Sequence, residues 1–169
     1  MNFRNAISAD ANMLLDLTES TFRESWLNEG NIFDLNAYVA ENFTVSVLNQ
    51  ELSNPNITYL LAEEKNQTMG YCKLERNLNP DGFKLKNPIS IGRLYVRKQF
   101  QKQSIGSKLL DESLLIGARE NFNNIWLGVW NKNPEAIRLY ERFGFRKIGG
   151  YQFKMGNEIS DDFIMHRPI

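Results

Sequence analysis

Two strand–turn–helix segments between residues 91 and 145 limit the folds open to this chain more than any other feature. The first is a short strand, Ile91–Val96, followed by a polar turn at 101–106 and then a long amphipathic helix. The second is the strand Ile125–Trp130, followed by a helix that starts near Pro134. Strands that alternate with helices in this way predict a mixed α/β architecture. A polar turn before a helix also exposes unpaired backbone N–H groups, which favour an anion such as phosphate.

Hydrophobic periodicity and turn signals divide the rest of the chain. We expect an opening strand at 3–7 and three helical segments at 10–22, 34–43 and 45–52. We also expect a hairpin of strands at 57–64 and 69–75, and two closing strands at 145–155 and 162–167. The helix after Asn133 is the best punctuated. Asn133 can cap it, Pro134 suits its first position, and Gly144 suits the left-handed position after its end. Together these elements predict a mixed α/β sandwich.

Size and composition exclude several classes of function. The 169 residues fit one domain, 1–169, without an internal repeat or a long linker. Twenty basic and twenty acidic residues give zero net charge, so we expect no broad nucleic-acid surface. A single cysteine, Cys72, rules out an internal disulfide and a Cys-rich metal site, and we expect no metal. Without a membrane-length apolar run, we expect no membrane association and a cytoplasmic location.

The turn at 101–106 resembles the cofactor loop of the GCN5-related N-acetyltransferases (the GNAT family). The family pattern is Gln/Arg-x-x-Gly-x-Gly/Ala, and here it reads Gln-Lys-Gln-Ser-Ile-Gly. Ser104 replaces the first glycine, which is tolerable if its φ is ordinary, and its hydroxyl could bond phosphate. Gly106 has no Cβ, so it lets a pyrophosphate approach the backbone. Taken without the resemblance, the turn is a polar helix start.

The helix after Asn133 carries a second family motif, Asn-x-x-Ala-x-x-x-Tyr-x-x-x-Gly-Phe. It is matched by Asn133, Ala136, Tyr140, Gly144 and Phe145. The resemblance implies that the asparagine contacts the pantetheine arm of the cofactor and that Tyr140 protonates the departing thiolate. A tyrosine with a pKa of ~10 remains protonated at neutral pH and can donate to a thiolate whose own pKa is ~8.5. The structural alternative makes Asn133 only a helix cap and Tyr140 only a core residue.

The resemblance also covers the strand before the cofactor loop. Leu94–Val96 align with the family strand whose backbone pairs with pantetheine, and a bulge there splays it from 125–129. Backbone donors near Leu94 could polarise the acetyl carbonyl. The implied GNAT fold is a mostly antiparallel sheet of about seven strands, splayed between the fourth and fifth and flanked by helices. The implied co-substrate is acetyl-CoA, bound by Leu94, Tyr95, Val96, Gln101, Lys102, Gln103, Ser104, Ile105, Gly106, Ser107, Asn133, Tyr140 and Arg142.

Within the family, the chain is most similar to the PaiA-type polyamine acetyltransferases. The likeness includes the run Trp126–Trp130 and the closing segments 153–156 and 162–165. It implies a primary amine acceptor, favouring a polyamine such as spermidine or spermine. Aromatic rings and carboxylates in the first helices suit a polycation, and the candidate substrate contacts are Glu24, Glu29 and Asp34.

One position departs from these relatives in a way that affects the chemistry. They carry a glutamate two residues before Leu94, where this chain has Gly92, so the base that activates the amine is in doubt. A neighbouring carboxylate or a water chain could take the proton, or the enzyme could bind the minor neutral amine. Because no other carboxylate lies in this strand, the sequence favours the second route, with kcat/KM rising towards the pKa of the amine.

These features predict an acetyl-CoA-dependent N-acetyltransferase that moves the acetyl group directly to a small-molecule amine. Two alternatives remain: acetylation of a protein or peptide amine, and a catalytically silent acyl-CoA sensor. Turnover of acetyl-CoA with a panel of amines distinguishes them. The sequence leaves a homodimer open.

Overall fold

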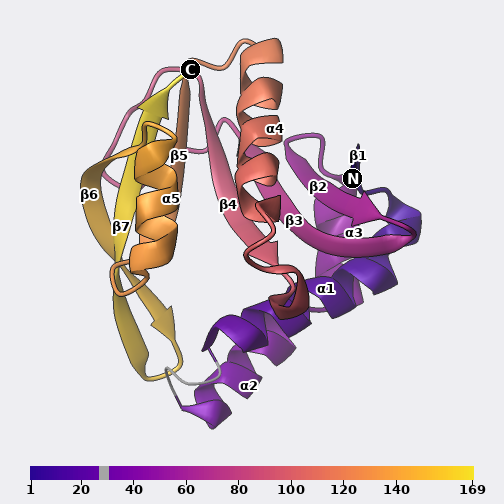
Figure 1. Cartoon of the computed structure of the whole chain (residues 1–169). Helices are drawn as coiled ribbons and strands as arrows, with labels where there is room; N and C mark the ends of the chain where they lie inside the picture. Colours follow the sequence, from indigo (N-terminus) through magenta and orange to yellow (C-terminus); the bar gives the residue numbers. More distant parts are fainter. Residues whose placement is uncertain (27–30) are drawn as a thin grey trace.

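The computed structural model describes residues 1–26 and 31–169 (Figure 1). The helices are α1 Ala11–Trp26, α2 Ile32–Asn42, α3 Val45–Ser53, α4 Ile105–Arg119 and α5 Pro134–Arg142, with single 3-10 turns η1 Ser8–Asp10 and η2 Lys98–Phe100. The strands are β1 Asn2–Asn5, β2 Ile57–Glu64, β3 Gln67–Arg76, β4 Pro88–Val96, β5 Asn124–Trp130, β6 Arg146–Met155 and β7 Glu158–Pro168. Within the described ranges, no helix has the length and apolar character needed to cross a membrane.

The seven strands form one sheet in the order β1-β2-β3-β4-β5-β7-β6. Every neighbouring pair is antiparallel except β4 and β5, which run parallel. The predicted mixed α/β fold, with a mostly antiparallel sheet of seven strands, is therefore confirmed.

The sheet divides between its two parallel strands. β4 and β5 pair only over Pro88–Ile91 and Asn124–Leu127, and beyond these residues they diverge towards α1 and α2 (Figure 1). A bulge in β4 lies at the point of divergence, because Arg93 pairs with Lys73 while Ile91 pairs with Leu74. Gly92 is the extra residue, two positions before the predicted bulge at Leu94. A bulge bends its strand and increases its twist, which turns β4 away from β5.

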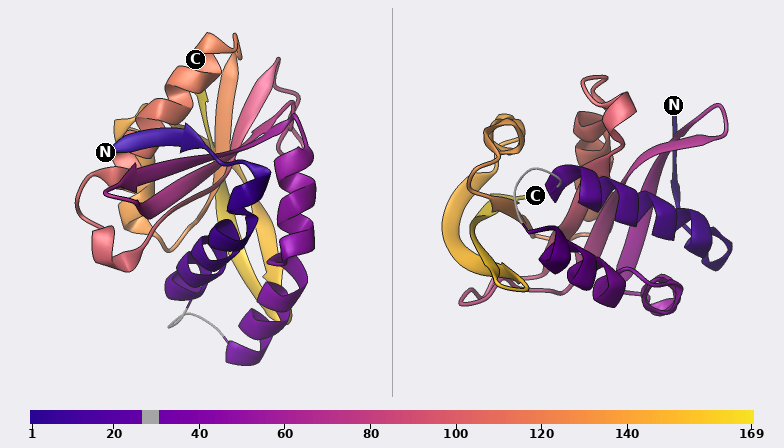
Figure 2. Two further views of the ribbon diagram at one scale, coloured as in Figure 1. Left: turned by 90° about the vertical axis from the view of Figure 1, so that its right-hand side faces the viewer. Right: turned by 90° about the horizontal axis from the view of Figure 1, so that it is seen from below.

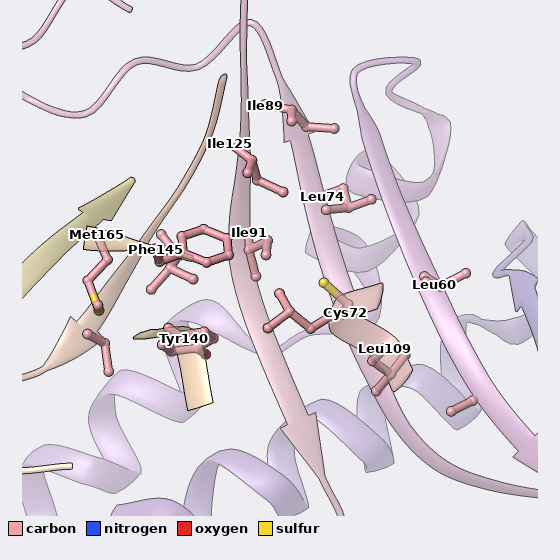
Figure 3. Close-up of a cluster of buried hydrophobic side chains, with 14 of the residues drawn as sticks. Leu60, Cys72, Leu74, Ile89, Ile91, Leu109, Ile125, Tyr140, Phe145 and Met165 are labelled. Atoms are coloured by element: carbon pink, nitrogen blue, oxygen red, sulfur yellow. The ribbon is translucent and has the colours of Figure 1, made fainter. Parts of the chain in front are cut away.

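Helices cover both faces of the sheet. α4 and α5 lie on one face and α1 to α3 on the other, as Figure 2 shows from below. The α4/α5 face carries the larger core, whose buried members include Ile91, Leu109, Tyr140 and Phe145 (Figure 3). The core of the α1–α3 face is formed by Leu14, Leu17, Leu48, Tyr59, Leu61 and Tyr71. Where β4 and β5 diverge, the side chains on the α4/α5 face therefore differ from those on the α1–α3 face.

Local sequence signals account for the ends of two helices. Asn133 caps α5 by accepting a hydrogen bond from the Ala136 N–H at 3.0 Å, and Gly144 takes a φ of +83° after the helix, both as predicted. The predicted start of α2 at Asp34 is wrong. Asn31 accepts from the Phe33 N–H at 2.8 Å and starts the helix at Ile32, because a capping side chain satisfies an N–H that would otherwise be unpaired.

Candidate active site

A run of free backbone donors lies between β4 and α4. From Lys102 to Ser107, none of the six N–H groups meets an acceptor in the part of the chain that the structure describes. The helical ladder begins only where the Lys108 N–H reaches the Ser104 carbonyl at 3.1 Å. These donors and the positive end of α4 form a place where phosphate oxygens can be bound.

The backbone of Ser104 decides how well a residue with a Cβ is tolerated at this position of the turn. Its φ is 60°, in the left-handed region, and Lys102 has a φ of 61°. The ordinary φ that would make a serine tolerable at this position is therefore not found. The turn into α4 needs left-handed backbone at this position, which glycine adopts freely and a residue with a Cβ adopts at a cost of roughly 1–2 kcal/mol. The family's preference for glycine here has this physical origin.

Gly106 joins the donor loop to the divergent end of β4. A Cβ built on Gly106 would lie 3.7 Å from Leu94 Cδ2, 3.8 Å from Val96 Cγ2 and 4.0 Å from Leu139 Cδ2. Position 106 thus faces β4 and α5 at once. The start of α4, which carries the free N–H groups, therefore packs next to the part of β4 that has separated from β5.

Among the described strands, Leu94–Val96 have a partner on one side and none on the other. They pair with Gly70–Cys72 of β3, and β5 no longer reaches them. The Gln101 amide donates to the Val96 carbonyl at 3.2 Å, which ties the donor loop to this strand. The other edge of β4 is therefore available to an extended, amide-bearing ligand such as pantetheine.

Tyr140 projects from α5 into the core beside the opening. Its side chain is only 7% exposed and meets Phe145 edge-on, with 5.9 Å between the ring centroids (Figure 3). Its hydroxyl makes no hydrogen bond to a described residue and is not among the fully enclosed polar atoms. Burial raises the pKa of Tyr140, so the phenol remains protonated well above neutrality. A protonated, unengaged hydroxyl is what a general acid requires.

The remaining predicted cofactor residues are more exposed. Asn133 uses its carbonyl oxygen for the α5 cap, which leaves its amide N–H groups free. Gln103 donates to the Gln99 carbonyl at 3.4 Å. Arg142 lies on the outer surface of α5, in a hollow shared with Glu135, Arg138 and Glu141. Arg142 is thus the predicted contact least tied to the opening of the sheet.

The two described carboxylates among those predicted for the acceptor each accept a hydrogen bond from a backbone N–H group. Glu24 accepts a hydrogen bond from the Lys98 backbone N–H at 3.1 Å, and Asp34 accepts one from the Asn157 N–H at 3.2 Å. Glu29 falls outside the described residues. Both described carboxylates thus serve to hold α1 and α2 to neighbouring turns.

A different carboxylate, Asp162, faces the opened sheet. Asp162 of β7 pairs with Trp130 of β5 on one side and with Tyr151 of β6 on the other. The three side chains therefore form a row on one face of the sheet. Trp26 of α1 stacks on Trp130, with 5.7 Å between the ring centroids. The Tyr151 hydroxyl is 3.3 Å from the Asp162 carboxylate, whose pKa is raised by burial. The sequence signal was strand alternation, which places Asp162 on the face opposite Phe163.

Two glycines mark the point where β4 and β5 separate. The last paired residues are Ile91 and Leu127, and the next residue in each strand is a glycine, Gly92 and Gly128. Each glycine is covered by a side chain from a neighbouring part of the sheet. A Cβ on Gly128 would overlap the Tyr151 hydroxyl, and one on Gly92 would overlap the Glu75 carboxylate.

Comparison with known proteins agrees with this architecture. PaiA N-acetyltransferase from Thermoplasma acidophilum, solved in complex with coenzyme A, superposes with a TM-score of 0.80 over 99% of this chain and 98% of that chain, at 20% identity. An uncharacterised N-acetyltransferase of Lactobacillus delbrueckii subsp. lactis is 22% identical over 90% of this chain and 88% of its own length. A probable spermine N(1)-acetyltransferase of Bacillus subtilis subsp. natto is 34% identical over 65 residues, which cover 37% of this chain and 42% of that protein.

The chain thus shares its fold with an N-acetyltransferase and is similar over most of its length to a protein of that class. The model of the acetyltransferase (GNAT) family matches residues 12–145, which include the donor loop, the diverging strands and the whole α5 motif. The chain belongs to this family, and it is an acetyltransferase enzyme.

Proposed function

We propose that the enzyme transfers an acetyl group from acetyl-CoA to a primary amine, with a polyamine as the preferred acceptor and residues 1–169 acting as one catalytic domain. The observation that supports the donor is the run of free N–H groups from Lys102 to Ser107 beside the open edge of β4. The N–H groups bind the pyrophosphate, and the edge at Leu94–Val96 pairs with the pantetheine amides. A relative with this fold, the PaiA enzyme, was solved with coenzyme A.

The chemistry proposed is direct transfer between the two bound substrates. Tyr140 supplies the proton that the departing sulfur takes up, because its buried hydroxyl stays protonated. A covalent acetyl-cysteine step is disfavoured. Cys72 is buried beside Ser113, and burial raises the pKa of its thiol to about 12, so little reactive thiolate forms at neutral pH.

The acceptor proposal is supported by the row of Asp162, Trp130 and Tyr151. A half-buried carboxylate between aromatic rings attracts an ammonium group by charge and by cation–π contact. A polyamine carries further ammonium groups besides the reacting one, and Asp162 can hold one of them. The name of one relative, a probable spermine N(1)-acetyltransferase, favours the same acceptor class.

An amine panel tests the proposal. With acetyl-CoA as donor and free thiol as readout, kcat/KM should be higher for spermidine and spermine than for an alkyl monoamine, and should fall as salt is added. Exposed charge pairs are screened over ~8 Å at physiological ionic strength, which is why salt should weaken the preference. Equal rates with a monoamine would contradict a polyamine site, and turnover only with peptide N-termini would favour peptide acetylation.

Asp162→Asn tests the proposed acceptor contact directly. Losing a charge-assisted hydrogen bond should lower kcat/KM for spermidine by roughly tenfold or more, and should affect an alkyl monoamine much less. Glu24→Gln is the matched control, because that carboxylate holds the Lys98 backbone N–H. An equal loss for both amines in Asp162→Asn would make Asp162 a structural residue.

A further inference from the structure

We propose that Glu75 of β3 is the general base that takes the proton from the acceptor amine. This inference rests on the proposed amine acetylation. It replaces the sequence-based expectation that the enzyme binds the neutral amine without a base of its own. That expectation considered β4 alone, whereas the carboxylate comes from the neighbouring strand.

The position of Glu75 carries the argument. Gly92 is both the extra residue of the β4 bulge and the first residue beyond the last β4–β5 pair. A Cβ built on Gly92 would overlap Glu75 Oε2 and lie 3.0 Å from Glu75 Cδ. The Glu75 carboxylate therefore occupies the space into which a side chain at position 92 would project. Gly92 leaves that space open at the point where the sheet opens.

The proposed acid and base lie on opposite faces of the sheet. Tyr140 belongs to the core under α4 and α5. The Glu75 side chain lies on the other face, where Lys73 links it to Glu51 of α3. An acetyl group placed between the diverging strands would be reached by the amine from the Glu75 side, while the sulfur leaves on the Tyr140 side. This arrangement lets one group take a proton from the amine while the other gives a proton to the sulfur.

The two carboxylate oxygens of Glu75 have different surroundings. Oε1 is held by Lys73 Nζ at 2.9 Å, and Lys73 Nζ also contacts Glu51 Oε1 at 2.7 Å. Within residues 1–26 and 31–169, the Ser90 hydroxyl, at 3.5 Å, is the one hydrogen-bond partner of Oε2, which is the oxygen next to Gly92. One oxygen is thus fixed and the other retains free lone pairs. A fixed carboxylate with an open oxygen is suited to accept a proton.

Further charges in this region complete its electrostatics. Arg93 lies on the same face, with its guanidinium 3.4 Å from the Tyr59 hydroxyl, and Tyr59 donates in turn to Glu51. Among the described residues, Lys73 contacts Glu75 directly, and Glu51, Tyr59 and Arg93 are linked to Lys73 through successive contacts. Because these groups are linked by contacts, single substitutions are needed to assign a change in rate to Glu75.

The proton balance of the step is complete. An alkylammonium loses two protons when it becomes an amide. One proton passes to Glu75 and from there to water. The neutral nitrogen then forms its bond to the carbonyl carbon, the carbon–sulfur bond breaks with its electron pair on sulfur, and Tyr140 protonates the sulfur. The second amine proton leaves to solvent and is balanced by reprotonation of Tyr140.

Glu75→Gln is the first test. It keeps the size of the side chain, and Lys73 retains its contact with Glu51. At pH 7 we expect kcat/KM for the best amine of the panel to fall by roughly 10²–10⁴-fold. The deficit should shrink towards pH 9, because the variant depends on amine that is already neutral in solution. The wild-type profile should level off at lower pH than that of the variant.

Two further variants separate a base from a structural ion pair. Glu51→Gln removes the other carboxylate on Lys73 and should change kcat/KM at pH 7 by no more than a few-fold. Gly92→Glu combined with Glu75→Ala returns a carboxylate to the same space from β4, and Gly92 has no positive φ to forbid a side chain. At pH 7, kcat/KM of this double variant should be at least about tenfold higher than that of Glu75→Gln. Acetyl-CoA affinity by calorimetry should match the wild type throughout.

The outcomes are distinct. A wild-type enzyme that acetylates no amine in the panel overturns the proposed function itself. Turnover in the wild type with Glu75→Gln within about twofold at pH 7, or with a loss equal to that of Glu51→Gln, overturns the role of Glu75 alone. A wild-type profile that rises up to the pKa of the amine also overturns it.

Discussion

Tyr140→Phe is expected to lower kcat by roughly 10²–10⁴-fold, while the fold and the affinity for acetyl-CoA stay close to those of the wild type. The substitution removes one oxygen from a side chain whose ring packs against Phe145 and whose hydroxyl bonds no described residue. Packing is therefore preserved and only the proton donor is lost. Steady-state kinetics with a saturating amine, together with thermal unfolding, measure both parts of this expectation.

The leaving group offers a control for this role. A donor whose thiol is more acidic than that of coenzyme A needs less help from an acid, so the ratio of wild-type to Tyr140→Phe rates should shrink with such a thioester. The pH dependence has a definite sign. Because burial raises the pKa of Tyr140, its ionisation should not reduce the wild-type rate below pH ~10. A kcat within about twofold of the wild type would assign Tyr140 to packing alone.

Local sequence signals predicted the framework because they act over a few residues. Asn133, Pro134 and Gly144 each satisfy a requirement of the α5 ends by themselves, and the structure shows them in those places. The strands on both sides of the opening, β4 and β5, could also be predicted from the sequence, because continuous apolar runs bounded by turns define them. The α2 start was missed because Asn31 lies before the segment in which helical periodicity is visible.

The side chains that gather around the opening could not be predicted in the same way. Glu75 reaches Gly92 from another strand, and the Tyr151 hydroxyl lies over Gly128, so each contact depends on strand register. Register across a bulge is decided by tertiary pairing, and a shift of one residue moves a side chain to the other face. The conformation of Ser104 depends similarly on how β4 enters α4.

Gly106→Asp should weaken acetyl-CoA binding by at least about a hundredfold, because two like charges 4 Å apart repel by about 4 kcal/mol at the effective dielectric of a protein surface. A Cβ at position 106 meets apolar side chains of β4 and α5, so thermal unfolding of the variant must be measured beside its affinity, and the comparison is made on folded protein. Calorimetric titration at two salt concentrations is the measurement, and the deficit should be smaller at high salt.

Gly106→Ala separates the effect of charge from that of size. A Cβ at position 106 meets Leu94, Val96 and Leu139 at 3.7–4.0 Å, which is ordinary van der Waals contact, so the alanine fits the protein itself. If the pyrophosphate approaches this backbone closely, alanine should cost some affinity and aspartate far more. Equal affinity in the wild type and a folded Gly106→Asp variant would place the pyrophosphate elsewhere, since no cofactor phosphate could rest on these N–H groups without meeting the new carboxylate.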